Sequence, residues 1–227
     1  MSGDRYSIDG SSSAYPDNLR RVYGGLALPL LRAVGNVNLL RRPAVGFCGS
    51  RKASERGLEV ASELAATLAE RGIVVASGYA KGVDTRAHLA ALRAGGATIV
   101  SLPEGLNNFR VKRELVEYWD EQQTLVLSQY MDEAVWRADR AMERNKVIVA
   151  ISNVTIVIEA GATGGTLDAG MTALKQQMPL FVVTYSDENE TNEGNRILLS
   201  AGAMRLGRNP KTGRANIERL LPYLESR

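Results

Sequence analysis

A series of short apolar runs, separated by helix-like segments, constrains this chain more than any other feature. Residues 44–48 (AVGFC), 73–77 (IVVAS) and 97–102 (ATIVSL) are the first three runs. Runs of this length are typical of strands buried on both faces. Between them, over residues 54–71 and 85–94, the sequence predicts helices. This alternation predicts right-handed βαβ units, and therefore a doubly wound, mostly parallel α/β sheet in a single domain.

The second half of the chain continues the pattern. Further strands are expected over residues 124–128, 154–159 and 180–184, and helices over about 109–121, 131–149 and 166–177. The stretch 195–199 and a final helix near 215–225 would close the sheet. We divide the chain into a mobile tail (1–14), a packed leading segment with one short helix (15–43), and the main domain with a C-terminal helical extension (44–227).

Composition excludes several classes of protein. The 227 residues are 44% hydrophobic and 23% charged, an ordinary globular balance. A single cysteine, Cys48, excludes an internal disulfide framework, and a single histidine, His88, excludes a two-histidine zinc motif. No apolar run approaches the roughly 18 residues of a membrane helix. We expect a cytoplasmic, soluble protein with no metal, no cofactor and no membrane partner.

Charge is distributed unevenly along the chain. The net charge of +3 comes from 28 basic and 25 acidic residues. Residues 1–115 hold 16 basic and 10 acidic residues, a balance of +6, and residues 116–227 hold 12 and 15, a balance of −3. A basic half is compatible with a polyanion-binding face, and equally with an ordinary solvated surface.

Ligands of doubly wound sheets sit beyond the carboxyl ends of the strands, so the loops that follow strands are the candidate sites. The first such loop is Gly49, Ser50 and Arg51. It exposes backbone N–H groups near a helix start, and the arginine fork suits phosphate oxygens. A plain turn with an exposed arginine is the alternative.

Two more loops repeat this composition. Gly78, Lys81 and Gly82 follow the second strand, and Thr163, Gly164, Gly165 and Thr166 follow the 154–159 strand. Three donor-rich loops on one sheet edge predict a phosphate-binding edge. None reads GxGxxG or GxxxxGK[ST], so an ordinary nicotinamide or Walker-type site is not supported.

Several other polar residues lie near this edge. Asp84 is expected to cap the helix that starts at residue 85, and His88 to support the second loop from below rather than to catalyse. Glu159 can bind a ribose or base edge, orient Arg51 or Arg144, or act as a general acid or base. Tyr79 and Phe109 are the aromatic candidates for base stacking.

A basic cluster lies in the middle of the predicted 131–149 helix. Arg144, Asn145 and Lys146 precede an apolar run, which predicts that Asn145 is turned inward. A surface patch is the alternative interpretation.

Taken in order, these segments resemble the DprA (Smf) family, the DNA-processing proteins of natural transformation. The resemblance rests on VGFCGSR, SGYAKGVDTRAHLAAL, GGATIVSLPEGL, RNKVIVAISN and VIEAGATGGTLDAGMTAL, and it spans about residues 15–184. It implies an extended Rossmann-like fold of the DprA and LOG type, binding of single-stranded DNA, homodimerisation, and transfer of the strand to a RecA-type recombinase. The match covers the family's Rossmann core, without the winged-helix and additional helical domains that many relatives carry.

The resemblance also implies which residues contact DNA. They are the candidates above that match the family's motifs, with Lys81 standing where the family usually has arginine and Lys146 ending an RNR-like triplet. Both lysines keep the charge but lose the planar fork, so weaker phosphate contacts are expected there.

Two alternatives stay open at this stage. One is a Rossmann-type sensor or carrier of a small nucleotide. The other is a LOG-like phosphoribohydrolase that cleaves nucleoside monophosphates, whose PGGxGTxxE motif carries a glutamate. Here that position falls on Ala169 or Asp168, which argues against the hydrolase.

Overall fold

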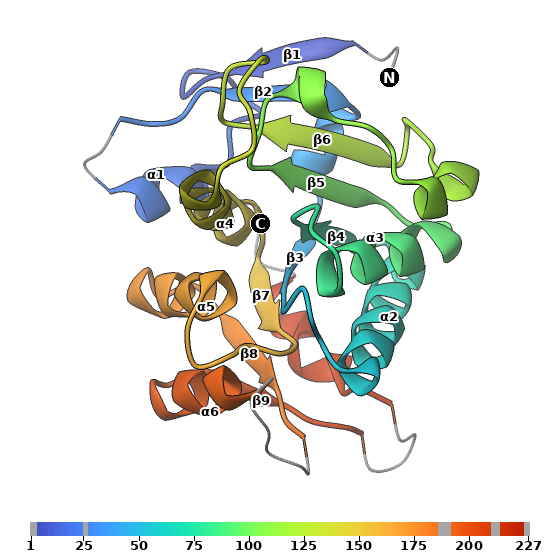
Figure 1. Ribbon diagram of the computed structural model, residues 1–227, viewed down its shortest axis with the longest axis vertical. Coiled ribbons are helices and arrows are strands. Elements are labelled where there is room, and N and C mark those ends of the chain that lie inside the picture. Colours follow the sequence, from blue (N-terminus) through green and yellow to red (C-terminus); the bar gives the residue numbers. More distant parts are fainter. Residues whose placement is uncertain (1–3, 25–26, 186–191, 210–213, 225–227) are drawn as a thin grey trace.

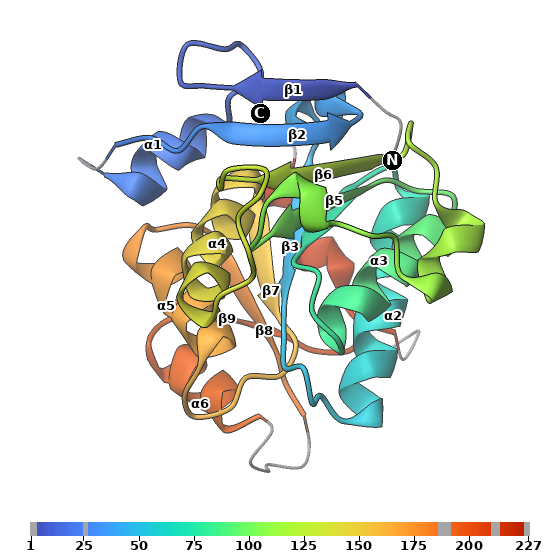
Figure 2. The same cartoon turned by 45° about the horizontal axis from the view of Figure 1, so that its top comes forward.

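The structure is a computed structural model that describes residues 4–24, 27–185, 192–209 and 214–224. These residues form one nine-stranded sheet with helices on both faces (Figures 1 and 2). The strands are β1 (Arg5–Ile8), β2 (Leu31–Gly35), β3 (Ala44–Cys48), β4 (Val74–Ser77), β5 (Thr98–Leu102), β6 (Thr124–Ser128), β7 (Val154–Val157), β8 (Leu180–Val183) and β9 (Met204–Leu206).

The order across the sheet is β1-β2-β6-β5-β4-β3-β7-β8-β9. The strands from β6 to β9 pair in parallel, and β1 and β2 are antiparallel additions beside β6. The predicted fold class, a doubly wound and mostly parallel α/β sheet, is confirmed. The chain reverses its direction of progress between β3 and β7, which makes this point the topological switch.

The helices divide between the two faces of the sheet. They are α1 (Asp17–Tyr23), α2 (Glu55–Glu70), α3 (Val83–Arg93), α4 (Ala138–Ile151), α5 (Gly165–Lys175) and α6 (Glu193–Ser200). Short 3₁₀ turns are η1 (Val37–Arg41), η2 (Leu106–Asn108), η3 (Arg113–Tyr118), η4 (Ile217–Arg219) and η5 (Leu221–Tyr223). The pair α2 and α3 covers one face, and α1, α4, α5 and α6 cover the other (Figures 1 and 2).

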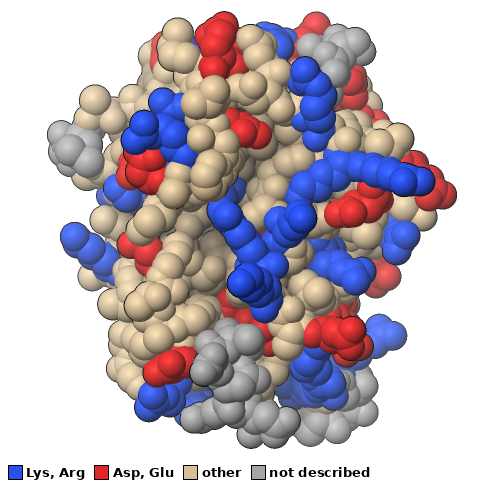
Figure 3. Space-filling view, in the orientation of Figure 1, with Lys and Arg blue, Asp and Glu red and all other residues tan. Residues whose placement is uncertain are grey.

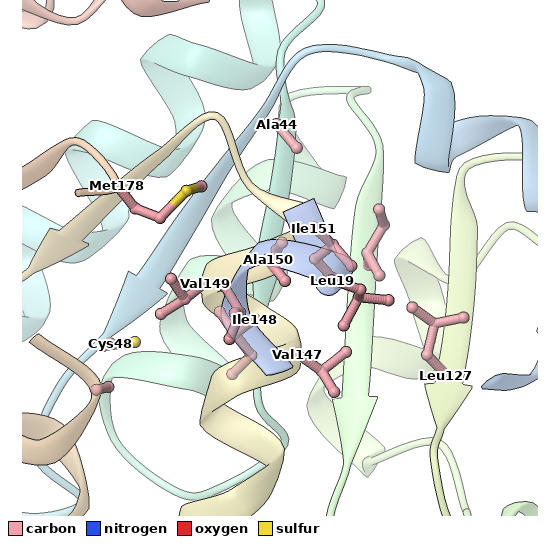
Figure 4. Packing of buried hydrophobic residues seen from close by; sticks show 14 of the residues in the cluster. Leu19, Ala44, Cys48, Leu127, Val147, Ile148, Val149, Ala150, Ile151 and Met178 are labelled. Carbon is pink, nitrogen blue, oxygen red and sulfur yellow. The ribbon is translucent and has the colours of Figure 1, made fainter. Parts of the chain in front are cut away.

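Alternating side chains of the central strands build a core on each face. In β3, Val45 and Phe47 pack toward α2 and α3, while Ala44 and Cys48 pack toward α4. The buried stretch 147–151 of α4 lies at the centre of the second core (Figure 4). Because both faces are covered, the strands have no need of polar residues, which explains their continuous apolar sequences.

Helix α2 follows the sequence signals closely. The Ser54 hydroxyl accepts a hydrogen bond from the Gly57 amide at 3.0 Å, a cap that stabilises helices by about 1 kcal/mol. Gly72 follows the helix with a φ of +75°, in the left-handed region that favours glycine. The predicted helix over 54–71 is thereby confirmed.

The predicted mobile tail over residues 1–14 is wrong for the part that the structure describes. Residues 5–8 form β1, which pairs with β2, and the side chains of Ile8 and Tyr15 are buried. The leading segment 15–43 contains the expected short helix, α1, but also contributes β2 to the main sheet. Residues 15–43 are therefore an integral part of the domain.

Two predicted helices are shorter than expected. Over 109–121 only the 3₁₀ segment η3 forms, because Phe109 and Lys112 are extended and pack against Tyr79. Helix α4 begins at Ala138 instead of residue 131. The preceding residues form a loop across the carboxyl ends of the strands, where the Gly105 amide donates to the Ala134 carbonyl.

The C-terminal extension also differs from the prediction. The short strand β9 was not expected, and the predicted helix over 215–225 is replaced by η4 and η5 within its described part. Pro222 lies in this stretch, and a proline lacks the N–H group that a continuous helix needs. Among the described residues, no helix has both the length and the apolar character required to span a membrane.

Candidate functional site

Two adjoining cavities lie at the carboxyl ends of β3, β4 and β5, beside the switch point. Their volumes are about 480 Å³ and 420 Å³. They share the lining residues Arg51, Lys52, Ala80, Trp136 and Arg144, so they form one continuous depression, which we call the groove. The first cavity is also lined by Ser50 and Thr166, and the second by Lys81. All three predicted loops therefore meet in the groove.

The first loop is held by its neighbours on both sides. A Cβ atom on Gly49 would overlap the Val83 side chain, so only glycine allows this close approach to α3. The Ser50 amide donates to the Glu159 carbonyl at 2.9 Å. The Arg51 side chain is exposed, and its guanidinium lies 5.6 Å from the centroid of the Trp136 ring.

The second loop joins β4 to α3 and is organised by Asp84. Helix α3 begins at Val83 after Gly82, whose φ is +82°, so the predicted N-cap role of Asp84 is wrong. The Asp84 carboxylate instead accepts hydrogen bonds from the Ser77 hydroxyl at 3.0 Å and the Ala80 amide at 3.1 Å. It lies one residue inside the helix because Gly82 already makes the turn.

Two basic side chains support the second loop from within the protein. The Nε2 atom of His88 lies 2.5 Å from the Gly78 carbonyl oxygen, as the predicted supporting role requires. Burial lowers the pKa of His88 to about 4, so this ring is neutral near pH 7. The Lys112 ammonium donates to the carbonyls of Tyr79 and Ala80 at 2.9 and 3.1 Å, and burial lowers its pKa.

Arg144 forms the buried base of the groove. Its side chain is about 95% buried, since the residue is 5% exposed, yet it lines both cavities. One guanidinium nitrogen, Nη1, donates to the Ser101 carbonyl at 2.6 Å, and Nε has no hydrogen-bond partner within the described residues. Burial lowers the pKa of Arg144, and the nearby Asp84 carboxylate opposes this shift. A guanidinium at the base of the groove is suited to an anionic ligand.

The third loop is tied to α4 through Asn145. The Asn145 side-chain amide donates to the Gly165 carbonyl at 2.9 Å, and Thr163, Gly165 and Thr166 line the groove. Gly164 has a φ of +103° and precedes α5. Gly78, Gly82 and Gly164 shape the loops but are not among the residues that line the two cavities.

Lys146 lies outside the groove, contrary to the expected basic cluster. Its ammonium pairs with Glu143 at 2.9 Å and lies 5.9 Å from the Tyr23 ring centroid, on the side of α4 that faces α1. One residue advances a helix by about 100°, so neighbours of Arg144 cannot all face the same cavity.

Glu159 supports the first loop and does not contact the arginines of the groove. Its carboxylate accepts from the Ser54 hydroxyl at 2.5 Å and the Ser54 amide at 2.8 Å. Glu159 is buried, with only 1% of its surface exposed. The proposed roles in orienting Arg51 or Arg144 are therefore wrong, because the carboxylate is occupied at the start of α2.

The aromatic side chains differ from those expected. Phe109 is buried against Tyr79 and Trp119, with ring centroids 5.0 and 5.6 Å away. The Tyr79 ring lines the groove but is also covered by the Lys112 ammonium, 4.4 Å from its centroid. Trp136, which is 48% exposed, is the available ring. Trp136 was not predicted as a site residue because the helix expected over 131–149 included it, whereas residue 136 lies in the loop between β6 and α4.

The surface agrees with this arrangement. Figure 3 shows Lys and Arg side chains gathered around a hollow near the middle of the face, between α4 and the β4–α3 connection. The cationic residues that line the groove are Arg51, Lys52, Lys81 and Arg144. Local concentration of cations, rather than the small net charge, makes this depression attractive to phosphates.

Comparison with known proteins shows the family to which the chain belongs. A profile described as DNA recombination-mediator protein A matches residues 7–213. The chain belongs to the DNA recombination-mediator protein A family. It is 33% identical over 191 residues to the DNA processing protein DprA of Streptococcus pneumoniae, covering 83% of this chain and 66% of the relative. It is 30% identical to the protein Smf of Escherichia coli, covering 88% of this chain and 54% of the relative.

The chain therefore spans about half to two thirds of the length of these curated relatives in the DNA recombination-mediator protein A family. Solved structures agree. DprA of Streptococcus pneumoniae matches with a TM-score of 0.78 at 31% identity, over 91% of this chain and 71% of that chain. DNA processing protein A of Helicobacter pylori, described with a single-stranded DNA binding mode, matches with a TM-score of 0.77 at 28% identity, over 98% and 96%.

A more distant match shows the fold alone. The molybdenum cofactor binding protein of Rippkaea orientalis has a TM-score of 0.56 at 24% identity, and the match covers 80% of this chain and 96% of that chain. It carries no information about the ligand of the groove.

Proposed function

We propose that this protein binds single-stranded DNA in the groove and acts as a recombination mediator. Phosphates of the strand lie against the three loops and on Arg51, Lys52, Lys81 and Arg144, and a base stacks on Trp136. Such binding is tolerant of sequence, because phosphates and ring faces are common to every nucleotide.

One observation carries this proposal: three loops from separate strands and the buried Arg144 meet in a single groove with an exposed tryptophan on its rim. A nucleoside monophosphate carries fewer negative charges than the cationic side chains that line the groove can neutralise. The relatives named for DNA processing, and the Helicobacter pylori protein described with a single-stranded DNA binding mode, favour a DNA strand over a free nucleotide as the ligand.

The role we propose is non-catalytic. The Glu159 carboxylate is occupied by Ser54, and Asp168 does not line the groove, so neither is placed as the acid or base of a hydrolase. We further propose that the protein forms a homodimer, works in the cytoplasm, and transfers the strand to a RecA-type recombinase, as the family resemblance implies.

The test is oligonucleotide binding by an Arg51→Ala variant, measured by fluorescence anisotropy with a labelled single strand. Loss of a charge-assisted phosphate contact should weaken binding by about tenfold or more, as such contacts contribute roughly 1.5–3 kcal/mol. Arg93→Ala is the matched control, because Arg93 ends α3 at the opposite edge of the sheet, beside Tyr118.

Circular dichroism and the melting temperature should be the same for both variants and the parent, since Arg51 is exposed. Equal affinities for the parent and Arg51→Ala would contradict the proposal. Binding of adenosine monophosphate, with no binding of oligonucleotides, would favour the nucleotide sensor instead.

A further inference from the structure

Two acidic side chains line the groove: Asp84, whose carboxylate is hydrogen-bonded within the second loop, and Glu104. Glu104 is the second residue after β5 and lines the 420 Å³ cavity together with Arg51, Lys81 and Trp136. Cavities of roughly 300–1,000 Å³ hold small ligand groups, so this one has room for a base. A carboxylate here repels phosphates, and a groove that served phosphates alone would be better without it.

The carboxylate of Glu104 has no partner within the described part of the chain. No hydrogen bond or ion pair is formed by its side-chain oxygens, although cations line the same cavity. Burial raises its pKa, and no neighbouring charge contributes to that shift. Its oxygens are therefore free to accept hydrogen bonds from a ligand that supplies donors.

The backbone holds Glu104 in fixed relation to the Trp136 loop. The Glu104 carbonyl accepts from the Ser128 hydroxyl at 2.6 Å. The next amide, that of Gly105, donates to the Ala134 carbonyl at 2.8 Å. A Cβ atom on Gly105 would overlap the carbonyls of Met131 and Asp132, so the two segments are in direct contact. Glu104 and Trp136 therefore line the same cavity from two segments in contact.

A base stacked on Trp136 presents its hydrogen-bonding edge to this cavity. An ionised carboxylate only accepts, and it can accept two parallel N–H bonds. Guanine offers two adjacent donors, N1–H and its exocyclic amine. Adenine and cytosine set one amine beside an acceptor nitrogen, and thymine sets its N–H between two carbonyls, so each of these also presents a repulsive acceptor.

We propose that Glu104 is a specificity-determining residue that selects guanine from a bound single strand. This inference rests on the proposed DNA-binding function. The strand is held through its phosphates at any sequence, and the position over Trp136 is occupied preferentially by guanine.

The experiment compares the affinities of labelled oligonucleotides of equal length: all-thymine, and the same strand with one guanine, adenine or cytosine. A single substitution avoids self-association of guanine-rich strands. For the parent protein, the strand with one guanine should bind about tenfold more tightly than the all-thymine strand, the scale of one bidentate base contact. Hypoxanthine in place of guanine removes the exocyclic amine and should lose most of this gain.

In Glu104→Gln the ratio of the two affinities should fall to about twofold or less, because an amide presents one acceptor and one donor. The all-thymine strand should bind equally well or more tightly, since a repulsive charge is gone. Glu133→Gln is the control: Glu133 is exposed in the neighbouring loop, does not line the groove, and should keep the parent ratio.

Equal affinity of the parent for guanine and thymine strands overturns this inference and leaves the DNA-binding function standing. A guanine preference that survives in Glu104→Gln also overturns it. If no oligonucleotide binds at all, the proposed function itself fails. The base series on the parent decides the matter even if the variant does not fold.

Discussion

Buried His88 links the stability of the protein to the shape of its second loop. The ring is fully buried between the Gly78 carbonyl and the Thr98 hydroxyl, 2.5 and 2.6 Å away. Burial lowers the pKa of His88 from 6.5 to about 4, so the folded state disfavours the imidazolium ion. The neutral His88 ring therefore supports the loop that carries Lys81 from inside the protein.

The sign of the pH dependence follows from this depression. The stabilising contribution is complete above pH 6.5 and is lost as the pH falls toward 4, because the unfolded chain then binds a proton that the folded chain does not. Between pH 7.5 and 5.5 the free energy of unfolding should decrease by about 1 kcal/mol through His88 alone. Urea unfolding at the two pH values measures this change.

The comparison with His88→Gln isolates the histidine from the carboxylates. In this variant the decrease between pH 7.5 and 5.5 should be smaller by the same amount, although the variant is less stable at both. An unchanged pH dependence in His88→Gln would show that the ring is free to titrate in the folded protein.

At the residue scale, the groove residues that directly follow strands could be predicted, because ligands of doubly wound sheets bind at the carboxyl ends of the strands. Residues brought to the groove from elsewhere could not. Ser50, Lys81 and Thr166 could be located because each follows a strand whose apolar run is unmistakable. Lys112 could not, since its role depends on packing against Tyr79 from a distant segment. Lys146 was misplaced because a basic triplet on a helix points in several directions.

At the scale of elements, the β4–α3 loop depends on the absence of a side chain at Gly78. A Cβ atom there would overlap the Arg144 guanidinium and the Asp84 carboxylate. Both groups are buried, so neither can move aside without losing contacts: Arg144 donates to Ser101, and Asp84 accepts from Ala80. The glycine thus lets a cation lie beneath the loop.

Gly78→Ala should therefore destabilise the protein by about 1–3 kcal/mol, the usual cost of overpacking. It should also weaken oligonucleotide binding, because Arg144 is displaced from the base of the groove. Gly207→Ala is the control, since an added Cβ atom there would meet only the Thr184 hydroxyl oxygen, 3.7 Å away. Urea unfolding and anisotropy titration of both variants, compared with the parent, measure the effects; wild-type behaviour of Gly78→Ala would refute the argument.

Elements with strong periodicity were predictable, and those fixed by tertiary contacts were not. Helix α2 has a cap, a regular apolar stripe and a terminating glycine, and it forms where expected. The segment 131–137 has helix-forming composition, yet backbone bonds to η2 hold it as a loop. Strand β1 has only one buried residue, Ile8, so its sequence lacks the alternation that would reveal a strand.

At the scale of the whole molecule, the cations of the groove act locally because the net charge is only +3. Single-strand binding that neutralises three or four phosphates should give a slope of about −2 to −3 for log affinity against log salt. Anisotropy titrations at salt concentrations from about 50 to about 200 mM measure the slope. In Arg51→Ala it should become shallower by about 0.7. A slope near zero in the parent would mean that phosphates are not the main contacts.

The hydrogen bonds between the first loop and Glu159, which lies two residues after β7, have a thermodynamic consequence. The Ser50 amide and the Ser54 amide and hydroxyl are all engaged by Glu159 before any ligand arrives. The backbone is thus preorganised, and association has to freeze only mobile side chains such as Arg51 and Lys81, at about 0.5–1.5 kcal/mol each. Under the proposed function, a strand would then be captured with almost no main-chain rearrangement.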